Sequence, residues 1–352
     1  MIFPVEYFSG DDILLYMKRL EVKNLNIAFR SGKVRTGIVG GVSFSVSPGE
    51  ILALVGESGC GKSISCLALT RLLPAPPAEI CADAITFHGA NGPVDLLKAS
   101  NRELRRVRGG GIAYIFQEPS ASLNPVFRIG DQIAESVALH RPEVTDLRAE
   151  VLELLRQVGI PDPESRIDAY PHELSGGMQQ RVMIAMALAG NPELLIADEP
   201  TTALDVTIQA QILELIDRMR KERNMAVILV THNLGIVAEL ADRVAVMYAG
   251  NLVETASAKE ILEHPAHPYT AALLKAVPRQ GGGRQKLDTI PGNVPPPGRY
   301  PAGCRFSDRC SRCAAGNEAM QNQCREIPPP VTEVREAHFC RCHQPLTEKD
   351  PA

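Results

Sequence analysis

A glycine-rich loop between two apolar segments constrains this chain more than any other feature. The apolar run Ile51–Val55 precedes the loop, and the pattern of residues 64–69 favours a helix after it. The spacing Gly-x-x-x-x-Gly-Lys-Ser fits a phosphate-binding loop, in which backbone N–H groups and a helix N-terminus surround an anion. The loop residues are Gly56, Glu57, Ser58, Gly59, Cys60, Gly61, Lys62 and Ser63.

Two side chains of this loop predict its chemistry. Lys62 can reach the β- and γ-phosphates of a nucleotide, and the hydroxyl of Ser63 can bind Mg²⁺. The alternative is a glycine turn that joins a strand to a helix by chance. The strand and the helix that the motif requires are both indicated, so the loop predicts a nucleotide-binding protein.

Length and charge narrow the class of protein. The 352 residues suggest two domains, or one large and one small domain. The formal net charge of −4 gives no electrostatic footprint for nucleic acid, and no apolar run approaches the roughly 20 residues that span a bilayer. Residues 1–10 lack the pattern of a signal peptide, and residues 1–17 show no clear period, as in a leader or an overlong start. We expect a cytoplasmic protein.

Three later apolar segments, each typical of a buried strand, end in polar side chains. They are residues 111–116 before Gln117, residues 193–197 before Asp198 and Glu199, and residues 225–231 before His232. In open α/β sheets, ligands bind at the carboxyl ends of such strands. Beside a phosphate loop we expect Asp198 to support Mg²⁺ and Glu199 to deprotonate a water, although two acids at a strand end can also simply be solvated.

The segments around these strands favour two subdomains. Short strands are predicted at residues 20–22, 26–29 and 42–46, and Phe29 is either a core aromatic or a platform for an adenine ring. From about residue 118 to 182 the apolar period is helical and is broken by prolines. Near its end, Ser175 suits a helix N-cap with two glycines behind it, which would leave backbone donors free.

The chain changes character after about residue 277. Glycine and proline runs replace the helical period, and six of the nine cysteines lie beyond residue 300. Such a tail is not expected to form an ordinary hydrophobic core, and clustered cysteines in a reducing compartment favour metal ligands over disulfides. The six are Cys304, Cys310, Cys313, Cys324, Cys340 and Cys342.

Together, the order of these motifs resembles the nucleotide-binding subunit of ABC transporters. Residues 117–125 (QEPSASLNP), 198–207 (DEPTTALDVT) and 264–270 (HPAHPYT) look like the oligopeptide/dipeptide (and nickel) importer subfamily, and closer to the first of its two paired ATPases. The resemblance implies an α/β fold, a P-loop NTPase (RecA-like) core with an antiparallel β subdomain and a helical subdomain at about 118–182. It implies an ABC ATP-binding domain at 18–275 and a small Cys-rich C-terminal extension at 276–352.

The family's roles in hydrolysis carry over onto matching positions. The resemblance implies that Ser63, Gln117 and Asp198 surround Mg²⁺ and that Gln117 reports to a membrane partner. Glu199 is the implied base, and His232 would contact the γ-phosphate of ATP. No catalytic position departs from the pattern, so we expect hydrolysis.

Other implied roles concern adenine and a second subunit. Phe29 would pack on adenine. Ser175, Gly176 and Gly177 would cap the γ-phosphate of ATP held by the opposite subunit, and Asp205 would lie in a loop across the dimer interface. Each site would thus need two chains.

The resemblance also suggests a use for the tail cysteines, because some members of the subfamily carry a 4Fe–4S cluster there. A structural Zn²⁺ suits four thiolates equally, and unligated thiols are a third interpretation. Either of the two remaining cysteines could replace a neighbour. The suggested ligands are Cys304, Cys310, Cys324 and Cys342.

The implied function is an ATP-hydrolysing subunit that powers import of peptides or a similar small solute by ATP-driven closure of a nucleotide-sandwich dimer. Its partners would be two transmembrane permease subunits, a second homologous ATPase and, indirectly, an extracytoplasmic solute-binding protein. It would sit peripherally on the cytoplasmic face of the cell membrane.

Two other functions make different predictions. A soluble ABC ATPase that acts on nucleic acid or ribosomes through a metal-binding tail should show a basic face or a second cassette, and the acidic net charge counts against it. A regulatory binder that holds ATP without hydrolysis should lack Glu199 or His232, and both are present.

Overall fold

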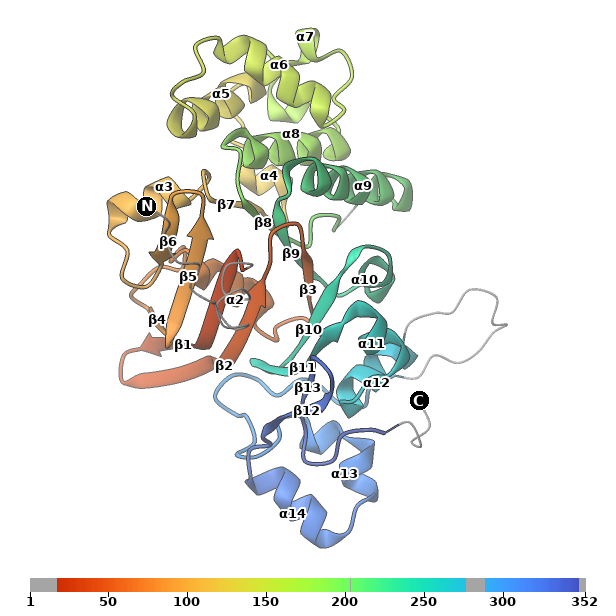
Figure 1. The fold of residues 1–352 in the computed structure, drawn as a ribbon. Coiled ribbons are helices and arrows are strands. Elements are labelled where there is room, and N and C mark those ends of the chain that lie inside the picture. The colour runs from red at the N-terminus through yellow and green to blue at the C-terminus, as the bar shows by residue number, and fades with distance from the viewer. Residues whose placement is uncertain (1–17, 203, 277–288, 348–352) are drawn as a thin grey trace, which may run out of the picture.

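A mostly parallel sheet forms the centre of the molecule. The structure, a computed structural model, describes residues 18–202, 204–276 and 289–347, so the predicted leader at residues 1–17 lies outside the described residues. Within them the sheet has the order β12-β13-β11-β10-β3-β9-β8-β7 (Figure 1). The strands are β3 (Ile51–Val55), β7 (Ile112–Ile115), β8 (Leu194–Asp198), β9 (Ala226–Thr231), β10 (Arg243–Tyr248), β11 (Asn251–Ser257), β12 (Val331–Arg335) and β13 (His338–Arg341).

The parallel strands are buried on both faces, which explains their continuous apolar sequences. Leu195 and Ala197 of β8 face a cluster that includes helices α8 (Gly176–Ala189) and α9 (Val206–Arg223). Leu194 and Ile196 of the same strand face the opposite cluster, which includes α2 (Lys62–Leu69). Helix α10 (Leu234–Leu240) covers β3 and β10 through a third cluster.

A second, antiparallel sheet packs against α2 (Figure 1). Its order is β2-β1-β5-β6, with β4 paired to β1. The strands predicted at residues 20–22 and 26–29 are one strand whose pairing with β2 shifts register on either side of Leu25, with Asn24 in the left-handed region at φ 51°. The elements are β1 (Leu20–Ser31), β2 (Val34–Val46), β4 (Ala78–Cys81), β5 (Ala84–Gly89), β6 (Gly92–Asp95) and helix α3 (Asn101–Val107).

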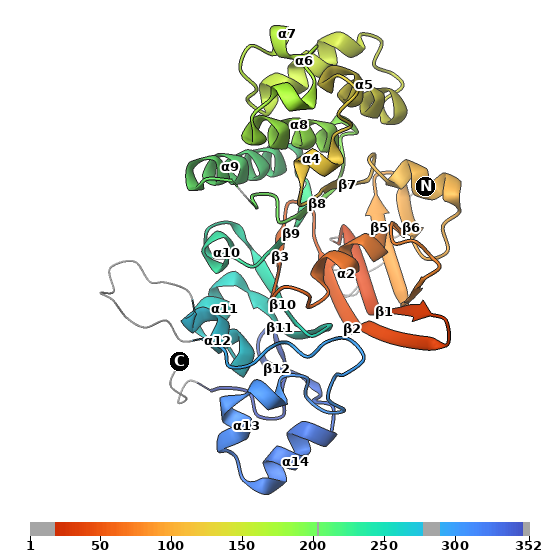
Figure 2. The ribbon, with the colours of Figure 1, turned by 180° about the vertical axis from the view of Figure 1, so that it is seen from behind.

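The predicted helical region forms the upper layer in both views (Figure 2). Helix α8 crosses the predicted subdomain limit at residue 182 and ends at Ala189, and its second half packs on β7 and β8. In the described ranges, none of the helices combines the length and hydrophobicity that a membrane span needs. The other helices are α4 (Pro119–Ser122), α5 (Ile129–His140), α6 (Leu147–Gln157), α7 (Pro163–Arg166) and η1 (Pro171–Glu173).

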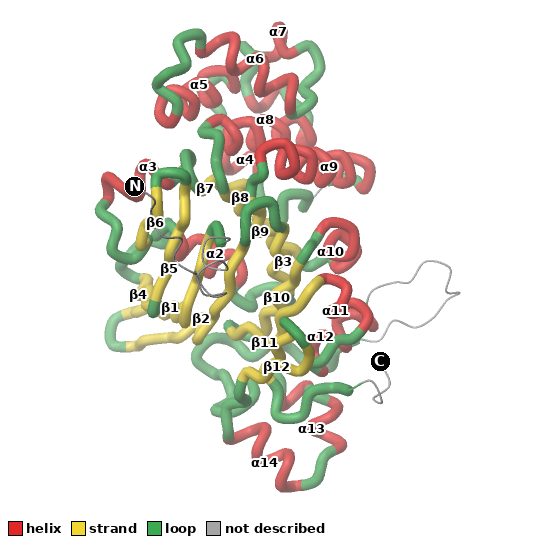
Figure 3. The backbone as a smooth tube through the Cα atoms, in the orientation of Figure 1, coloured by secondary structure: helices red, strands yellow, loops and turns green. Residues whose placement is uncertain are grey.

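The described part of the tail does not stand apart from the ATP-binding core. Strand β13 pairs with β11 through Glu254↔Cys340 and Thr255↔Phe339, so the tail extends the central sheet (Figure 3). Phe306 joins the third buried cluster, which supplies the hydrophobic core that we did not expect for the tail. The predicted boundary at 275/276 falls at the end of α12. The elements are α11 (Ala258–Glu263), α12 (Pro268–Lys275), η2 (Ser307–Arg309), α13 (Ser311–Ala315) and α14 (Glu318–Glu326).

A buried carboxylate fastens the C-terminal hairpin to the core, and its removal should destabilise the protein. Glu254 is 1% exposed and accepts hydrogen bonds from Ala266 N (2.6 Å), His267 N (2.9 Å) and His338 Nε2 (2.7 Å). Glu254→Ala leaves these donors buried without a partner, so we expect the free energy of unfolding to fall by roughly 3–5 kcal/mol. Urea denaturation measures this, with exposed Glu263→Ala as the control. A loss no larger than the control's would contradict the assignment.

Candidate nucleotide site

The phosphate loop lies between β3 and α2, as predicted. Gly56, Gly59 and Gly61 have φ values of 151°, 77° and 103°, which side chains disfavour. A Cβ at Gly56 would clash with the carbonyl oxygen of Met247 on the neighbouring strand. The glycines therefore let the loop turn tightly beside the neighbouring strand, a geometry that typically directs backbone N–H groups toward an anion.

Two backbone carbonyl oxygens of the loop hold its lysine in place. Lys62 Nζ donates to the carbonyl oxygens of Gly56 (2.8 Å) and Glu57 (3.2 Å) and lies 3.8 Å from Cys60 Sγ. Cys60 is 1% exposed, and burial raises the pKa of its thiol. A neutral thiol fits beneath the loop, and the ammonium group of Lys62 is already at the loop where phosphates would bind.

Asp198 and Ser63 form a donor set that fits Mg²⁺. Burial raises the pKa of Asp198, while a hydrogen bond with the Ser63 side chain opposes that rise. Asp198 Oδ1 is buried and has no hydrogen-bond partner among the described residues. A carboxylate oxygen without a partner beside a serine hydroxyl matches the oxygen ligands that Mg²⁺ prefers.

The Glu199 carboxylate contacts three side chains, two of which come from distant segments. Its Oε1 lies 3.1 Å from His232 Nδ1, and its Oε2 accepts from Gln117 Nε2 (3.2 Å) and Thr202 Oγ1 (3.0 Å). Glu199 has φ 47°, and its backbone N–H donates to Val230 O at 2.9 Å. The structure thus brings the three predicted catalytic residues together, and it adds Thr202, which the sequence analysis did not single out.

The residues predicted to serve a second subunit have local roles in this chain. The Ser175 side chain accepts from Met178 N and caps α8, and the Asp205 side chain accepts from Ile208 N and caps α9. A Cβ at Gly176 would meet no atom within 4 Å, so this helix end is open. Phe29 is half-buried against the core of the antiparallel sheet, which fits the core interpretation and leaves part of its ring accessible.

Five tail cysteines line one small cavity of about 20 Å³, and none is disulfide-bonded. Burial raises the pKa of Cys304 to about 11 and those of Cys324 and Cys342 to about 12. Within residues 18–202, 204–276 and 289–347, no group of three or more His, Cys, Asp or Glu residues is arranged to hold a metal ion. The thiol chemistry fits a metal, but the predicted ligand geometry is not shown. The five are Cys304, Cys310, Cys313, Cys324 and Cys342.

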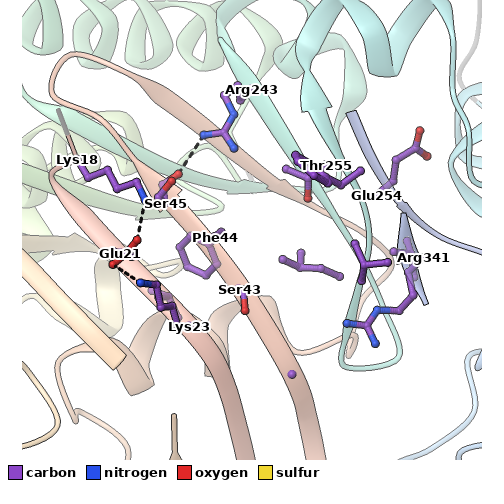
Figure 4. Close-up of a pocket in the computed structure, with 16 residues that line it drawn as sticks. Lys18, Glu21, Lys23, Ser43, Phe44, Ser45, Arg243, Glu254, Thr255 and Arg341 are labelled. Carbon is purple, nitrogen blue, oxygen red and sulfur yellow. Dashed lines mark hydrogen bonds and ion pairs between the residues drawn. The ribbon is translucent and has the colours of Figure 1, made fainter. Parts of the chain in front are cut away.

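A cavity of about 450 Å³ lies away from these residues, between β2, β11 and β13 (Figure 4). Glu21 there is shared by Lys18 (2.6 Å) and Lys23 (3.0 Å), and Arg243 donates to Ser45 O (3.1 Å). None of the predicted nucleotide residues lines it. This cavity marks the seam between the antiparallel sheet and the C-terminal hairpin, away from the predicted nucleotide residues.

Two contacts with the phosphate loop were missed by sequence reasoning. Tyr269 Oη accepts from Glu57 N at 2.9 Å, and Arg309 forms an ion pair with the Glu57 carboxylate at 3.0 Å. These residues lie 212 and 252 positions from Glu57. Tyr269 lies in the motif at 264–270 that supported the resemblance, but no spacing rule links that motif or Arg309 to the loop.

Comparison with known proteins decides the family. The ABC transporter model matches residues 39–202, and the model for the C-terminal region of oligopeptide/dipeptide transporters matches residues 253–316. A putative peptide import ATP-binding protein of Brucella ovis is 49% identical over 331 residues, which cover 92% of this chain and 96% of the relative. The chain belongs to the ABC transporter ATP-binding proteins, in their oligopeptide/dipeptide branch.

Two further similarities describe this ABC ATP-binding protein. The dipeptide transport ATP-binding protein DppD of Haemophilus influenzae is 46% identical over 95% of this chain and 97% of its own length. A dimeric structure of a bacterial ABC transporter cassette is 25% identical, with a TM-score of 0.58, over 68% of this chain and 98% of that chain. As an ABC ATPase, the chain hydrolyses ATP.

Proposed function

We propose that the chain hydrolyses ATP to drive the import of peptides through a membrane permease. The observation that carries the proposal is the arrangement of Glu199 with Gln117 and His232 beside a complete phosphate loop. Relatives whose names refer to peptide import and dipeptide transport match over nearly their whole length, which supports peptides as the solute class.

In the proposed mechanism the chain positions ATP and one water. Lys62 would turn from the loop carbonyls to the β- and γ-phosphates, and Ser63 and Asp198 would hold Mg²⁺, which would supply positive charge beside the phosphates. Glu199 accepts a proton from the water as its oxygen bonds to the γ-phosphorus and the bond to ADP breaks. His232 contacts the γ-phosphate and Gln117 the water shell, and the hydrogen bonds of both to Glu199 keep the base aimed.

The proposed motor is a dimer with a second, homologous ATPase. The open N-terminus of α8 at Ser175, Gly176 and Gly177 offers backbone donors to a γ-phosphate from another chain. Asp205, at the N-terminus of α9, lies beside the proposed interface, and Phe29 stacks on adenine. Similarity to a cassette solved as a dimer supports this assembly. ATP then joins the subunits, and hydrolysis releases them.

The proposed permease contact is a cavity of about 230 Å³ next to Gln117. Phe116, 42% exposed, lines it together with Tyr114 of β7 and Met183 and Met186 of α8. A permease segment in this cavity would touch the residue before Gln117 and so sense the nucleotide site. The chain would then lie peripherally on the cytoplasmic face of the membrane, with a solute-binding protein acting through the permeases. Action on nucleic acid is disfavoured by the net charge of −4.

The cysteine cavity supports a further part of the proposal, a 4Fe–4S cluster. Five thiols converge there, and iron would supply the positive charge that favours their thiolate forms. Anaerobically purified protein should contain about four irons and four sulfides per chain. A fall in both for Cys304→Ser, with no change for the control Cys340→Ser outside this cavity, would support the ligand set. One zinc per chain would replace the cluster by a structural ion, and absence of both metals would end the assignment. The proposed ligands are Cys304, Cys310, Cys324 and Cys342, with Cys313 as the substitute.

Peptide uptake by the native cells tests the main proposal. Cells that lack this chain should lose uptake of labelled di- and oligopeptides and keep uptake of free amino acids. Wild-type protein should restore uptake, and Lys62→Ala should not, because the lysine that binds the phosphates is gone. Unchanged peptide uptake in the deletion strain would contradict peptide import and would leave ATP hydrolysis as a separate result.

A further inference from the structure

The second residue of the phosphate loop is held by the C-terminal part of the chain. Arg309 Nη1 donates to Glu57 Oε1 (3.0 Å) and Oε2 (3.2 Å), and Arg309 Nη2 donates to Oε2 (3.2 Å). The backbone N–H of Glu57 donates to Tyr269 Oη at 2.9 Å. Both the carboxylate and the backbone of Glu57 are therefore held by residues outside the loop.

Arg309 is itself held in place by its own surroundings. Its side chain is only 7% exposed, its Nε donates to Pro291 O (2.8 Å), and its Nη1 donates to Tyr248 Oη (3.2 Å). The guanidinium also lies over the Tyr248 ring, 5.7 Å from its centroid. A buried, multiply bonded guanidinium is a fixed charge, unlike a flexible surface arginine.

A cluster of aromatic rings supports both groups that hold Glu57. Phe306, three residues before Arg309, packs edge-on against Tyr248, with 5.1 Å between ring centroids, and lies 5.3 Å from the Tyr269 ring. Tyr248 and Tyr269 are 4.6 Å apart. The two groups that hold Glu57, the Arg309 guanidinium and the Tyr269 hydroxyl, thus share one packed support.

The ion pair with Arg309 neutralises the negative charge of Glu57. Its carboxylate belongs to a loop that binds a highly anionic triphosphate, and its carbonyl oxygen accepts from Lys62 Nζ at 3.2 Å. A carboxylate without a partner there would repel the phosphates, because like charges at short range interact strongly away from bulk water. Paired with Arg309, the carboxylate contributes no net charge.

We propose that Arg309 is a positioning residue for ATP binding, which neutralises Glu57 and fixes the conformation of the phosphate loop from the C-terminal part of the chain. This inference rests on the proposed function of the loop in binding ATP. It makes the C-terminal region a determinant of nucleotide affinity as well as a structural extension.

Four full-length proteins test the proposal through KM for MgATP, kcat and the Kd for MgATP from calorimetry. Arg309→Gln should raise KM and Kd roughly tenfold, the size expected when one partner of a charged hydrogen-bonded pair is removed, while kcat changes less than about twofold. In the double variant Glu57→Gln/Arg309→Gln, KM and Kd should return to within about threefold of the wild-type values. The increase in Arg309→Gln should also shrink with added salt, which screens repulsion.

Glu57→Gln with Arg309 intact completes the set and does not depend on the folding of an Arg309 variant. It leaves the guanidinium charge beside the phosphates uncancelled, so Kd for MgATP should fall below the wild-type value. An unchanged KM in Arg309→Gln, a KM that Glu57→Gln fails to rescue, or an increased Kd in Glu57→Gln alone would each overturn the proposal. Wild-type protein that fails to bind MgATP would instead contradict the proposed function.

Discussion

Replacement of Glu199 by Gln should reduce kcat for ATP hydrolysis by roughly 10²–10⁴-fold, the range that a general base contributes. The amide has the shape of the carboxylate and can still accept a hydrogen bond from Thr202, but it cannot take the proton of the attacking water. MgATP binding should persist, because neither Lys62 nor Asp198 is touched. A coupled assay for ADP release and calorimetric titration of MgATP separate the two effects.

The control for this experiment is Glu214→Gln, which makes the same chemical change on an exposed face of α9. It should leave kcat and Kd unchanged. If Glu199→Gln hydrolysed ATP at the rate of Glu214→Gln, Glu199 would not be the base, and its contacts with Gln117 and His232 would need another explanation.

Replacement of Asp198 by Asn should strongly reduce ATP hydrolysis and at the same time stabilise the protein without nucleotide. The carboxylate has a buried oxygen without a hydrogen-bond partner in the described residues, and an amide would weaken its hold on Mg²⁺. Loss of metal-assisted charge stabilisation should lower kcat by roughly 10²-fold or more. Hydrolysis assays across a Mg²⁺ titration measure this, and recovery at high Mg²⁺ would indicate weakened binding of the metal.

The stability effect follows from the pKa of Asp198. Burial raises that pKa in the folded protein, so the folded state binds the proton more tightly than the unfolded state does. The contribution of Asp198 to stability is therefore most favourable at low pH, falls as pH rises from the ordinary pKa through the raised one, and is least favourable at neutral pH. Asn carries no such penalty, so we expect Tm at neutral pH without nucleotide to rise by about 1–3 °C. The gain should shrink at acidic pH, and a lower Tm for Asp198→Asn at neutral pH would contradict this reasoning.

Much of the nucleotide site was predictable because its functional residues lie in short sequence segments with recognisable local patterns. The loop from Gly56 to Ser63 needs only a strand before it and a helix after it, and both are local patterns. The positions of Asp198 and His232 followed from apolar strands that end in polar residues. Parallel pairing of β8 with β9 and of β9 with β3 then places those ends at one edge of the sheet.

Two predictions about the fold were wrong, and each has a physical reason. The division of β1 at residues 23–25 was wrong because the exposed polar pair Lys23 and Asn24 interrupts the alternation, whereas the strand continues through a bulge. The tail looked too poor in apolar pattern to pack. It packs because Phe306 enters a cluster built by β10 and α12, and because β13 completes hydrogen bonds on the edge of β11.

The sequence by itself determined which residues can meet phosphate, Mg²⁺ and water, since glycines, a lysine, acids and strand ends act through local geometry and chemical type. Only the tertiary structure decided which residues meet one another. Pairing of Glu57 with Arg309, enclosure of Glu254 by His338 and convergence of five cysteines on one cavity each join segments far apart in the chain. Such contacts depend on how sheets and helices pack around a common core, and no local sequence pattern indicates which distant segments will meet.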